Sequence, residues 1–133
     1  MKKSAFFGTI AAATFAAGFA AAGTLEDVQA AGELKCGVTT GLAGFALADA
    51  NGVWDGFDVA VCRAVAAADL GDSNAVKFVP TTGKTRFTAL ASGEIDLLAR
   101  NTTWTFSRDV DLKFEFVGVN YYDGQGFMAP KAL

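Results

Sequence analysis

The sequence contains no histidine among its 133 residues, and only two cysteines and two prolines. The missing histidine removes the commonest acid–base group at neutral pH and the usual protein ligand of zinc and haem. Two cysteines are too few for a cysteine-only zinc or iron–sulfur site. We therefore expect no metal site and no cofactor.

Positive charge is also scarce, because 11 Lys and Arg stand against 14 Asp and Glu and leave a net charge of −3. Nucleic-acid binding relies on clustered Lys and Arg, which this composition does not favour. The content of 52% hydrophobic and 19% charged residues is typical of a globular chain rather than a disordered or fibrous one. The length suits one compact domain. The charge balance argues against nucleic-acid binding by that domain.

The first 23 residues have the layout of a secretory signal peptide. Lys2 and Lys3 precede an apolar run rich in Ala, Phe and Gly, and Ala20 and Ala22 form the small-x-small pattern of a cleavage site. A permanent transmembrane helix needs about 20 strongly apolar residues, whereas this run is short and dominated by Ala and Gly. We expect cleavage near Ala22 or Gly23 and a periplasmic location for the mature chain.

Export to an oxidising compartment permits a disulfide bond. Cys36 and Cys62 are the only candidates, so the pairing is unambiguous. Two buried free thiols are the alternative. We expect the Cys36–Cys62 bridge because the leader directs the chain out of the cytoplasm.

The rest of the chain alternates short β-prone and helical segments. We expect helices over residues 25–31, 57–70 and 84–92, strands over 34–38, 75–79 and 95–99, a tight Asn-Gly hairpin turn within 49–55, and further β-prone stretches over 114–122 and 125–129. Strand–helix–strand spacing of this kind indicates right-handed βαβ crossovers. The predicted fold class is α/β, with a parallel sheet covered by helices on both faces.

The long helix has clear local signals. Asp55 is placed to cap its amino end, and Asp58 lies in the first turn, where a carboxylate stabilises the helix dipole. Phe57, Val61 and Val65 recur every fourth residue and predict the buried face. Cys62 would lie beside that face.

Ligands of parallel sheets bind beyond the carboxyl ends of the strands, which places function in the loops 39–44, 80–83 and 100–108. The third loop combines hydroxyl groups, an amide, an aromatic ring and two guanidinium groups. Arg108 offers a planar fork of donors that matches a carboxylate. Asn101 and Thr103 supply groups suited to an ammonium or to the other carboxylate oxygen.

Other interpretations of these loops remain open. Arg108 could form a surface ion pair with Asp109 or Asp111, and residues 101–103 fit the acceptor pattern for glycosylation. Phe45 could form an apolar wall for a ligand or belong to the core. Catalysis has weak support, because no Ser or Cys has a His to activate it.

Several stretches together resemble a known family. They are LKCGV at 34–38, GVWDGFD at 52–58, CRAVA at 62–66, RFTAL at 86–90, SGEID at 92–96, RNTTWT at 100–105 and YYDGQGFM at 121–128. The chain resembles the periplasmic solute-binding proteins of polar amino-acid ABC importers, and most closely their general L-amino-acid-binding branch.

The resemblance implies a type II periplasmic binding protein, whose two α/β lobes close on a free L-amino acid and deliver it to the membrane permease subunits of the importer. Arg108 then corresponds to the arginine that holds the ligand α-carboxylate. Asn101 and Thr103 correspond to groups around the carboxylate and ammonium, and Phe45 to the apolar wall.

The chain is two to three times shorter than that family. The resemblance implies the amino-terminal part of the first lobe over residues 24–123 and the start of a crossover strand over 124–133, without the second lobe. We expect weak or no binding by this part alone, and self-association through an exposed sheet edge. The alternatives are a dehydratase-like periplasmic enzyme of the same fold and an interaction module that binds no amino acid.

Overall fold

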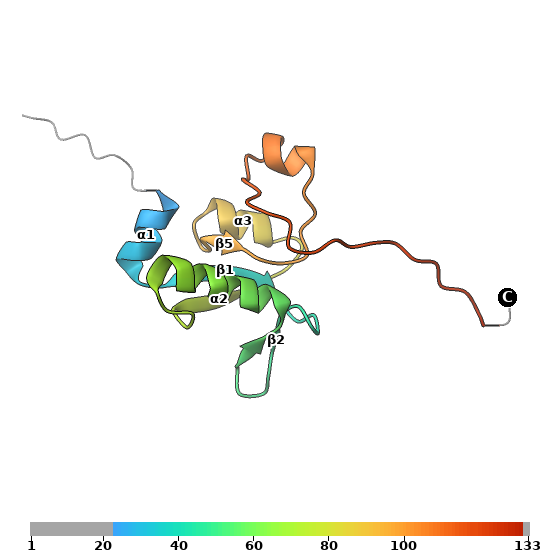
Figure 1. Cartoon of the computed structure of the whole chain (residues 1–133). Helices are drawn as coiled ribbons and strands as arrows, with labels where there is room; N and C mark the ends of the chain where they lie inside the picture. Colours follow the sequence, from blue (N-terminus) through green and yellow to red (C-terminus); the bar gives the residue numbers. More distant parts are fainter. Residues whose placement is uncertain (1–22, 132–133) are drawn as a thin grey trace, which may run out of the picture.

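The computed structural model describes residues 23–131, and the predicted signal peptide lies outside this range except for its last residue. The elements in chain order are α1 (Thr24–Ala31), β1 (Leu34–Thr39), β2 (Leu47–Ala48), β3 (Trp54–Asp55), α2 (Phe57–Leu70), β4 (Val76–Thr81), α3 (Arg86–Ala91), β5 (Leu97–Leu98) and the π-helical turn η1 (Ser107–Asp111) (Figure 1). Within residues 23–131 no helix has both the length and the apolar character needed to cross a bilayer.

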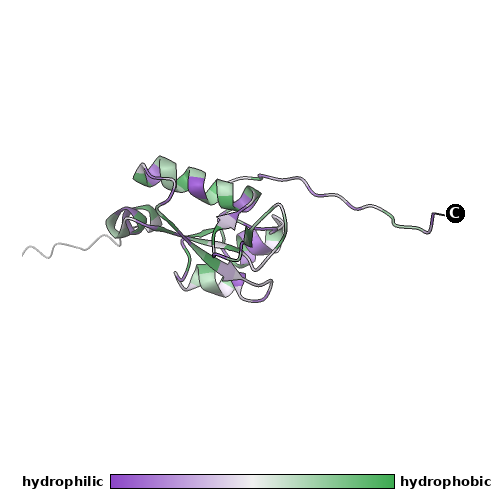
Figure 2. Ribbon diagram, turned by 90° about the horizontal axis from the view of Figure 1, so that it is seen from below, coloured by the Kyte–Doolittle hydropathy of each residue, from purple (hydrophilic) through white to green (hydrophobic). Residues whose placement is uncertain are grey.

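The main sheet has three parallel strands in the order β4-β1-β5. β1 pairs with β4 along its whole length, from Leu34 opposite Val76 to Thr39 opposite Thr81. β5 pairs with the middle of β1, where Cys36 lies opposite Leu97. Seen along the sheet, α2 covers one face and α3 the other (Figure 2). The predicted α/β class, with a parallel sheet between helices, is confirmed.

The core between β1 and α2 contains the predicted disulfide. Cys36 of β1 and Cys62 of α2 are bonded, with their Cα atoms 6.1 Å apart and both residues fully buried. Val38 and Val59 pack beside them. The covalent link therefore fixes the long helix to the central strand.

The buried face of α2 differs from the predicted one. Val59, Cys62 and Ala66 are fully buried, whereas Phe57 remains 41% exposed. Val, Ala and Phe occupy most sides of this helix, so apolar spacing alone does not single out one face. The disulfide and the contact with β1 settle which side turns inward.

A glycine shapes the opposite face of β1. A Cβ atom on Gly37 would lie 2.4 Å from Cδ1 of Ile95, which is 1% exposed. The missing side chain lets Ile95 pack directly on the central strand. The segment between α3 and β5 therefore lies close against the sheet.

The amino end of α2 has no side-chain cap. Gly56, with φ of 128°, occupies the cap position predicted for Asp55. The N–H groups of Phe57 and Asp58 donate instead to the carbonyl oxygens of Gly44 and Phe45, at 2.9 and 2.8 Å. Backbone acceptors from the loop after β1 thus take the place of a side chain, and they attach that loop to the helix.

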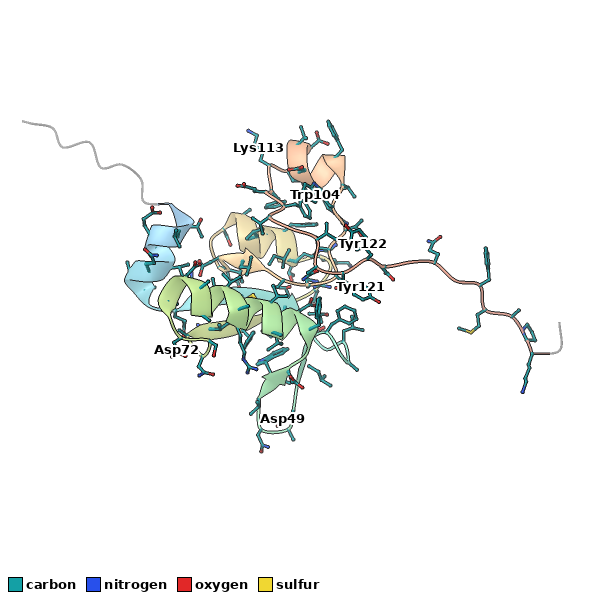
Figure 3. The ribbon with its side chains drawn as sticks, viewed as in Figure 1. Asp49, Asp72, Trp104, Lys113, Tyr121 and Tyr122 are labelled. Atoms are coloured by element: carbon teal, nitrogen blue, oxygen red, sulfur yellow. A yellow bond between two sulfur atoms is a disulfide. The ribbon has the colours of Figure 1, made fainter. Side chains whose placement is uncertain are left out.

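The predicted Asn-Gly turn is confirmed in the β2–β3 hairpin. Oδ1 of Asp49 accepts the backbone N–H groups of Asn51 and Val53, each at 2.8 Å. These bonds lower the pKa of Asp49, and the bond from Val53 has the largest effect. Gly52 adopts φ of 81°, which the turn requires. Figure 3 shows Asp49 at the tip of this hairpin, away from the main sheet.

The predicted strands over 114–122 and 125–129 are wrong for this structure, because residues 112–130 form neither helix nor strand. A strand requires a hydrogen-bonded neighbour, and in the part of the chain that is described no other segment pairs with this one. Aromatic contacts hold its first half: Phe114 stacks on Phe87, and Phe116 stacks on Trp104. Beyond Tyr122 the chain leaves the body of the protein (Figure 3).

Candidate ligand-binding site

The loops after β1, β4 and β5 lie at one edge of the sheet because the three strands are parallel. The amino end of α2 reaches the same edge through its bonds to Gly44 and Phe45. Polar residues are buried here, namely Thr39, Thr81 and Asp58. The combination of a helix amino end, strand ends and buried polar groups is the usual setting of a ligand site in such sheets.

Three guanidinium groups gather around residues 101–103. They belong to Arg86 at the start of α3, to Arg100 two residues after β5, and to Arg108 in η1. Within residues 23–131 none of the three lies within ion-pair distance of a carboxylate. Guanidinium groups without an acidic partner are well suited to receive an anion.

Two of these arginines bind the backbone of the loop itself. Nη1 of Arg86 donates to the carbonyl oxygen of Asn101 at 2.9 Å and to Oγ1 of Thr102 at 3.2 Å. Nη1 of Arg108 donates to the carbonyl oxygen of Thr103 at 2.6 Å. Each guanidinium has five N–H donors, so both retain donors for a ligand.

The same two guanidinium groups share an aromatic ring. Cζ of Arg86 lies 4.8 Å from the ring centre of Phe87, and Cζ of Arg108 lies 5.3 Å from it. Burial, followed by the positive charges of Arg100 and Arg108, lowers the pKa of Arg86. The like charges therefore repel one another in the absence of an anion.

Arg100 and Asp58 form the inner part of the site. Nη1 of Arg100 donates to the carbonyl oxygen of Thr81 at 2.7 Å, and Nη2 donates to Oδ1 of Asn101 at 2.9 Å. Asp58 is 2% exposed, and its Oδ2 has no hydrogen-bond partner. Burial raises the pKa of the Asp58 carboxyl, and the nearby Arg100 charge partly offsets this effect.

The structure brings three of the four predicted ligand residues together: Asn101, Thr103 and Arg108. The alternative ion pairs of Arg108 with Asp109 or Asp111 are not formed, since Oδ2 of Asp109 accepts the indole N–H of Trp104 at 2.8 Å. Figure 3 shows Trp104 beside the η1 turn. The indole thus takes up one carboxylate oxygen that could otherwise have reached Arg108.

Phe45, the fourth predicted residue, lies at the amino end of α2. Its ring packs edge-to-face on Phe57 at 6.3 Å and on Tyr121 at 5.1 Å. Phe45 is half-buried. Its backbone carbonyl oxygen accepts the Asp58 N–H, and this bond connects the residue to the inner part of the site. It therefore belongs to an aromatic group of its own.

A cavity of about 600 Å³ adjoins the arginine group. Its walls come from α3, from β5 and the residues around it, and from residues 112–118 of the extended segment. Arg100 and Thr102 supply polar groups to its lining, and Phe87 and Phe114 supply aromatic ones. Among the described residues no cluster of His, Cys, Asp and Glu could hold a metal ion.

Sequence reasoning gave no role to Arg86 or Arg100, and it interpreted Asp58 only as a residue that stabilises the helix dipole. That interpretation of Asp58 is incomplete, because the side chain is buried next to Arg100 rather than exposed at a helix end. Arg100 begins the loop 100–108. Its position as a charged residue directly after the predicted buried strand 95–99 is a sequence signal for a place in the site. Arg86 offers none, because only the tertiary fold brings α3 to this loop.

Three parallel strands covered by helices, with polar loops and three arginines at the carboxyl edge of the strands, define an α/β lobe of the kind that binds ligands at this edge. The chain belongs to the bacterial extracellular solute-binding proteins, family 3, whose family model matches residues 34–132.

Two curated relatives match the whole chain. It is 68% identical over 133 residues to the glutamate/glutamine/aspartate/asparagine-binding protein of Rhodobacter capsulatus, of which it spans 39%. It is 57% identical over 135 residues to the general L-amino acid-binding periplasmic protein of Rhizobium johnstonii, of which it spans 40%. The chain therefore spans about two fifths of the length of these relatives.

Solved structures share the fold. A periplasmic binding protein from Brucella ovis with glutathione bound is 62% identical, with a TM-score of 0.77 over 79% of this chain and 33% of that one. A second structure, the arginine-bound form of domain 1 from TmArgBP, is 27% identical, with a TM-score of 0.57 over 64% of each chain. The structural neighbours confirm a type II periplasmic binding fold, of which the chain covers part of one lobe.

Proposed function

We propose that this chain is the amino-acid-binding part of the solute receptor of an ABC importer, and that Arg108 holds the α-carboxylate of a free L-amino acid. The observation that carries the proposal is the group of three guanidiniums around residues 101–103, none of which lies within ion-pair distance of a carboxylate among the described residues. Asn101 and Thr103 complete the carboxylate and ammonium contacts, and Phe45 supplies an apolar wall. The names of the relatives support an amino acid as the solute.

The same proposal covers location and partners. The relatives include a periplasmic protein, and the apolar leader of residues 1–23 fits a signal peptide cleaved near Ala22 or Gly23. The membrane permease subunits of the importer are the expected partners. We assign residues 24–123 to the first lobe and 124–133 to the start of the crossover toward a second lobe.

The affinity of this part alone follows from its exposure to water. A ligand on a single lobe keeps one side solvated, so its ion pair with Arg108 is screened and weak. We expect dissociation constants in the millimolar range or weaker, roughly −4 kcal/mol or less favourable. The arginine-bound domain 1 supports the view that one lobe of this fold can hold an amino acid.

Titration of the ¹⁵N-labelled chain with a panel of L-amino acids, followed by NMR, tests the proposal. We expect saturable shifts of the amide signals of residues 100–108. Replacement of the ligand carboxylate by an alcohol, or the change Arg108→Gln, should abolish them. Arg63→Gln is the matched control, because Arg63 binds the carbonyl oxygen of Trp54 far from this loop in sequence. Shifts that survive in Arg108→Gln, or submicromolar binding, would refute the proposal.

A further inference from the structure

The Arg100 side chain connects two loops of the site. Nη1 donates to the carbonyl oxygen of Thr81 at the end of β4, at 2.7 Å. Nε and Nη2 both donate to Oδ1 of Asn101, at 3.2 and 2.9 Å. One half-buried guanidinium therefore sets the position of the Asn101 side chain relative to the sheet.

These bonds decide which way the Asn101 amide faces. A guanidinium has only donors, so the atom that receives two of its N–H groups must be the amide oxygen. The amide nitrogen, Nδ2, is then turned away from Arg100 with both its hydrogens. Asn101 is exposed, and its Nδ2 donates to no group among the described residues. In this orientation both N–H groups of the Asn101 amide remain free to donate, while its oxygen is engaged by Arg100.

Asp58 supplies a negative charge near Arg100. Its carboxyl is buried, has an oxygen without a hydrogen-bond partner, and interacts electrostatically with Arg100. Without this charge, Arg100 would face only the like charge of Arg86. The negative charge of Asp58 thus offsets the positive charge of Arg100, the guanidinium that binds the Asn101 side chain.

We propose that Arg100 is a positioning residue that locks the Asn101 amide with its NH₂ group toward the ligand, so that Asn101 binds the carboxylate and not the ammonium of the amino acid. The inference rests on the proposed function and sharpens it, because Asn101 alone could serve either group. It also assigns a role to each member of the sequence Asp58, Arg100, Asn101.

The first arm of the test needs no ligand. In ¹H–¹⁵N spectra of the free chain, the Arg100 Nε–H signal should be protected from exchange with water, because this hydrogen binds Oδ1 of Asn101. We expect that protection to persist in Asn101→Asp, which keeps an acceptor there, and to disappear in Asn101→Ala. Equal protection in all three proteins would overturn the proposed lock whether or not the chain binds amino acids.

The second arm measures which end of the ligand Asn101 reads. The probes are L-glutamine and 4-aminobutanamide, the same molecule without the α-carboxylate. Asn101→Asp places an acceptor and a negative charge where the amide donors were, while Arg100 gains a charged partner that maintains the fold. We expect the affinity for glutamine to fall at least about tenfold, through loss of a charge-assisted hydrogen bond, and the affinity for the amine to rise.

Asn74→Asp is the control, because it makes the same charge change before β4, at the opposite end of that strand. It should leave the glutamine affinity within about twofold of the original. An Asn101→Asp protein that binds glutamine as well as this control would overturn the assignment of Asn101 to the carboxylate. An unmodified chain that binds 4-aminobutanamide as well as L-glutamine would instead refute the proposed function, because no group would then hold the α-carboxylate, and the first arm would still decide the lock.

Discussion

Reduction of the Cys36–Cys62 bond should remove a large share of the stability of this chain. The bond closes a loop with a sequence separation of 26 residues. For a loop of this length the chain-entropy relation gives a stabilisation of about 3.5 kcal/mol. Small domains have unfolding free energies of only about 5–15 kcal/mol, so the loss is a quarter or more of the total.

The burial of both cysteines makes reduction a clean perturbation. Both residues are fully buried between β1 and α2, and breaking the bond removes no heavy atom from this core. The predicted loss corresponds to a decrease in melting temperature of roughly 15–25 °C for a domain of about 100 residues. In urea it corresponds to a midpoint lower by about 2 M.

Urea unfolding followed by circular dichroism, with and without a phosphine reductant, measures the effect. The double variant Cys36→Ala/Cys62→Ala is the control, because it should not respond to the reductant. If the oxidised and reduced chains differ by less than about 1 kcal/mol, the loop-entropy argument fails for this protein.

Three further predictions concern the amino end of α2 and the surface. Gly56→Ala should lower the unfolding free energy by about 2 kcal/mol or more, because the new Cβ would meet the Phe45 carbonyl oxygen at 2.4 Å; Gly52→Ala, which adds strain without a contact, should cost clearly less in the same urea assay. The raised pKa of Asp58 means that the folded chain gains stability relative to Asp58→Asn as pH falls through that pKa toward 3.8. The urea midpoint of the original chain should therefore rise relative to that of Asp58→Asn as the pH falls across this interval, and a constant difference would contradict the buried carboxylate. The exposed apolar side chains of the last third of the chain should make its sedimentation coefficient rise with concentration, whereas a constant monomer value would refute self-association.

Much of the fold could be predicted from sequence because its signals are local. The carboxyl end of α2 follows from Gly71 after it, and the parallel order follows from the alternation of strands and helices. The inward face of α2 could not be predicted, since Val and Ala surround that helix. The segment 114–122 has β-prone residues, but strand formation also requires a neighbour, and a propensity does not supply one.

The candidate site divides in the same way. Asn101, Thr103 and Arg108 lie within eight residues of one another, and the chemistry of that loop alone indicates a carboxylate receptor. Arg86 and Asp58 reach it from different helices, so only the tertiary fold shows that they belong there. The charge balance of the site, three guanidiniums and one buried carboxyl, is therefore a property that sequence reasoning could not supply.

The ring of Tyr121 makes a T-shaped contact with Phe45 and contacts Phe57 as well. Under the proposed function, in which Phe45 is an apolar wall, a solute whose side chain packs on that wall would compete with Tyr121. Its apparent affinity is reduced by the fraction of time that Tyr121 covers the ring. Under the same proposal, solutes with short or polar side chains would not compete with Tyr121 for this ring.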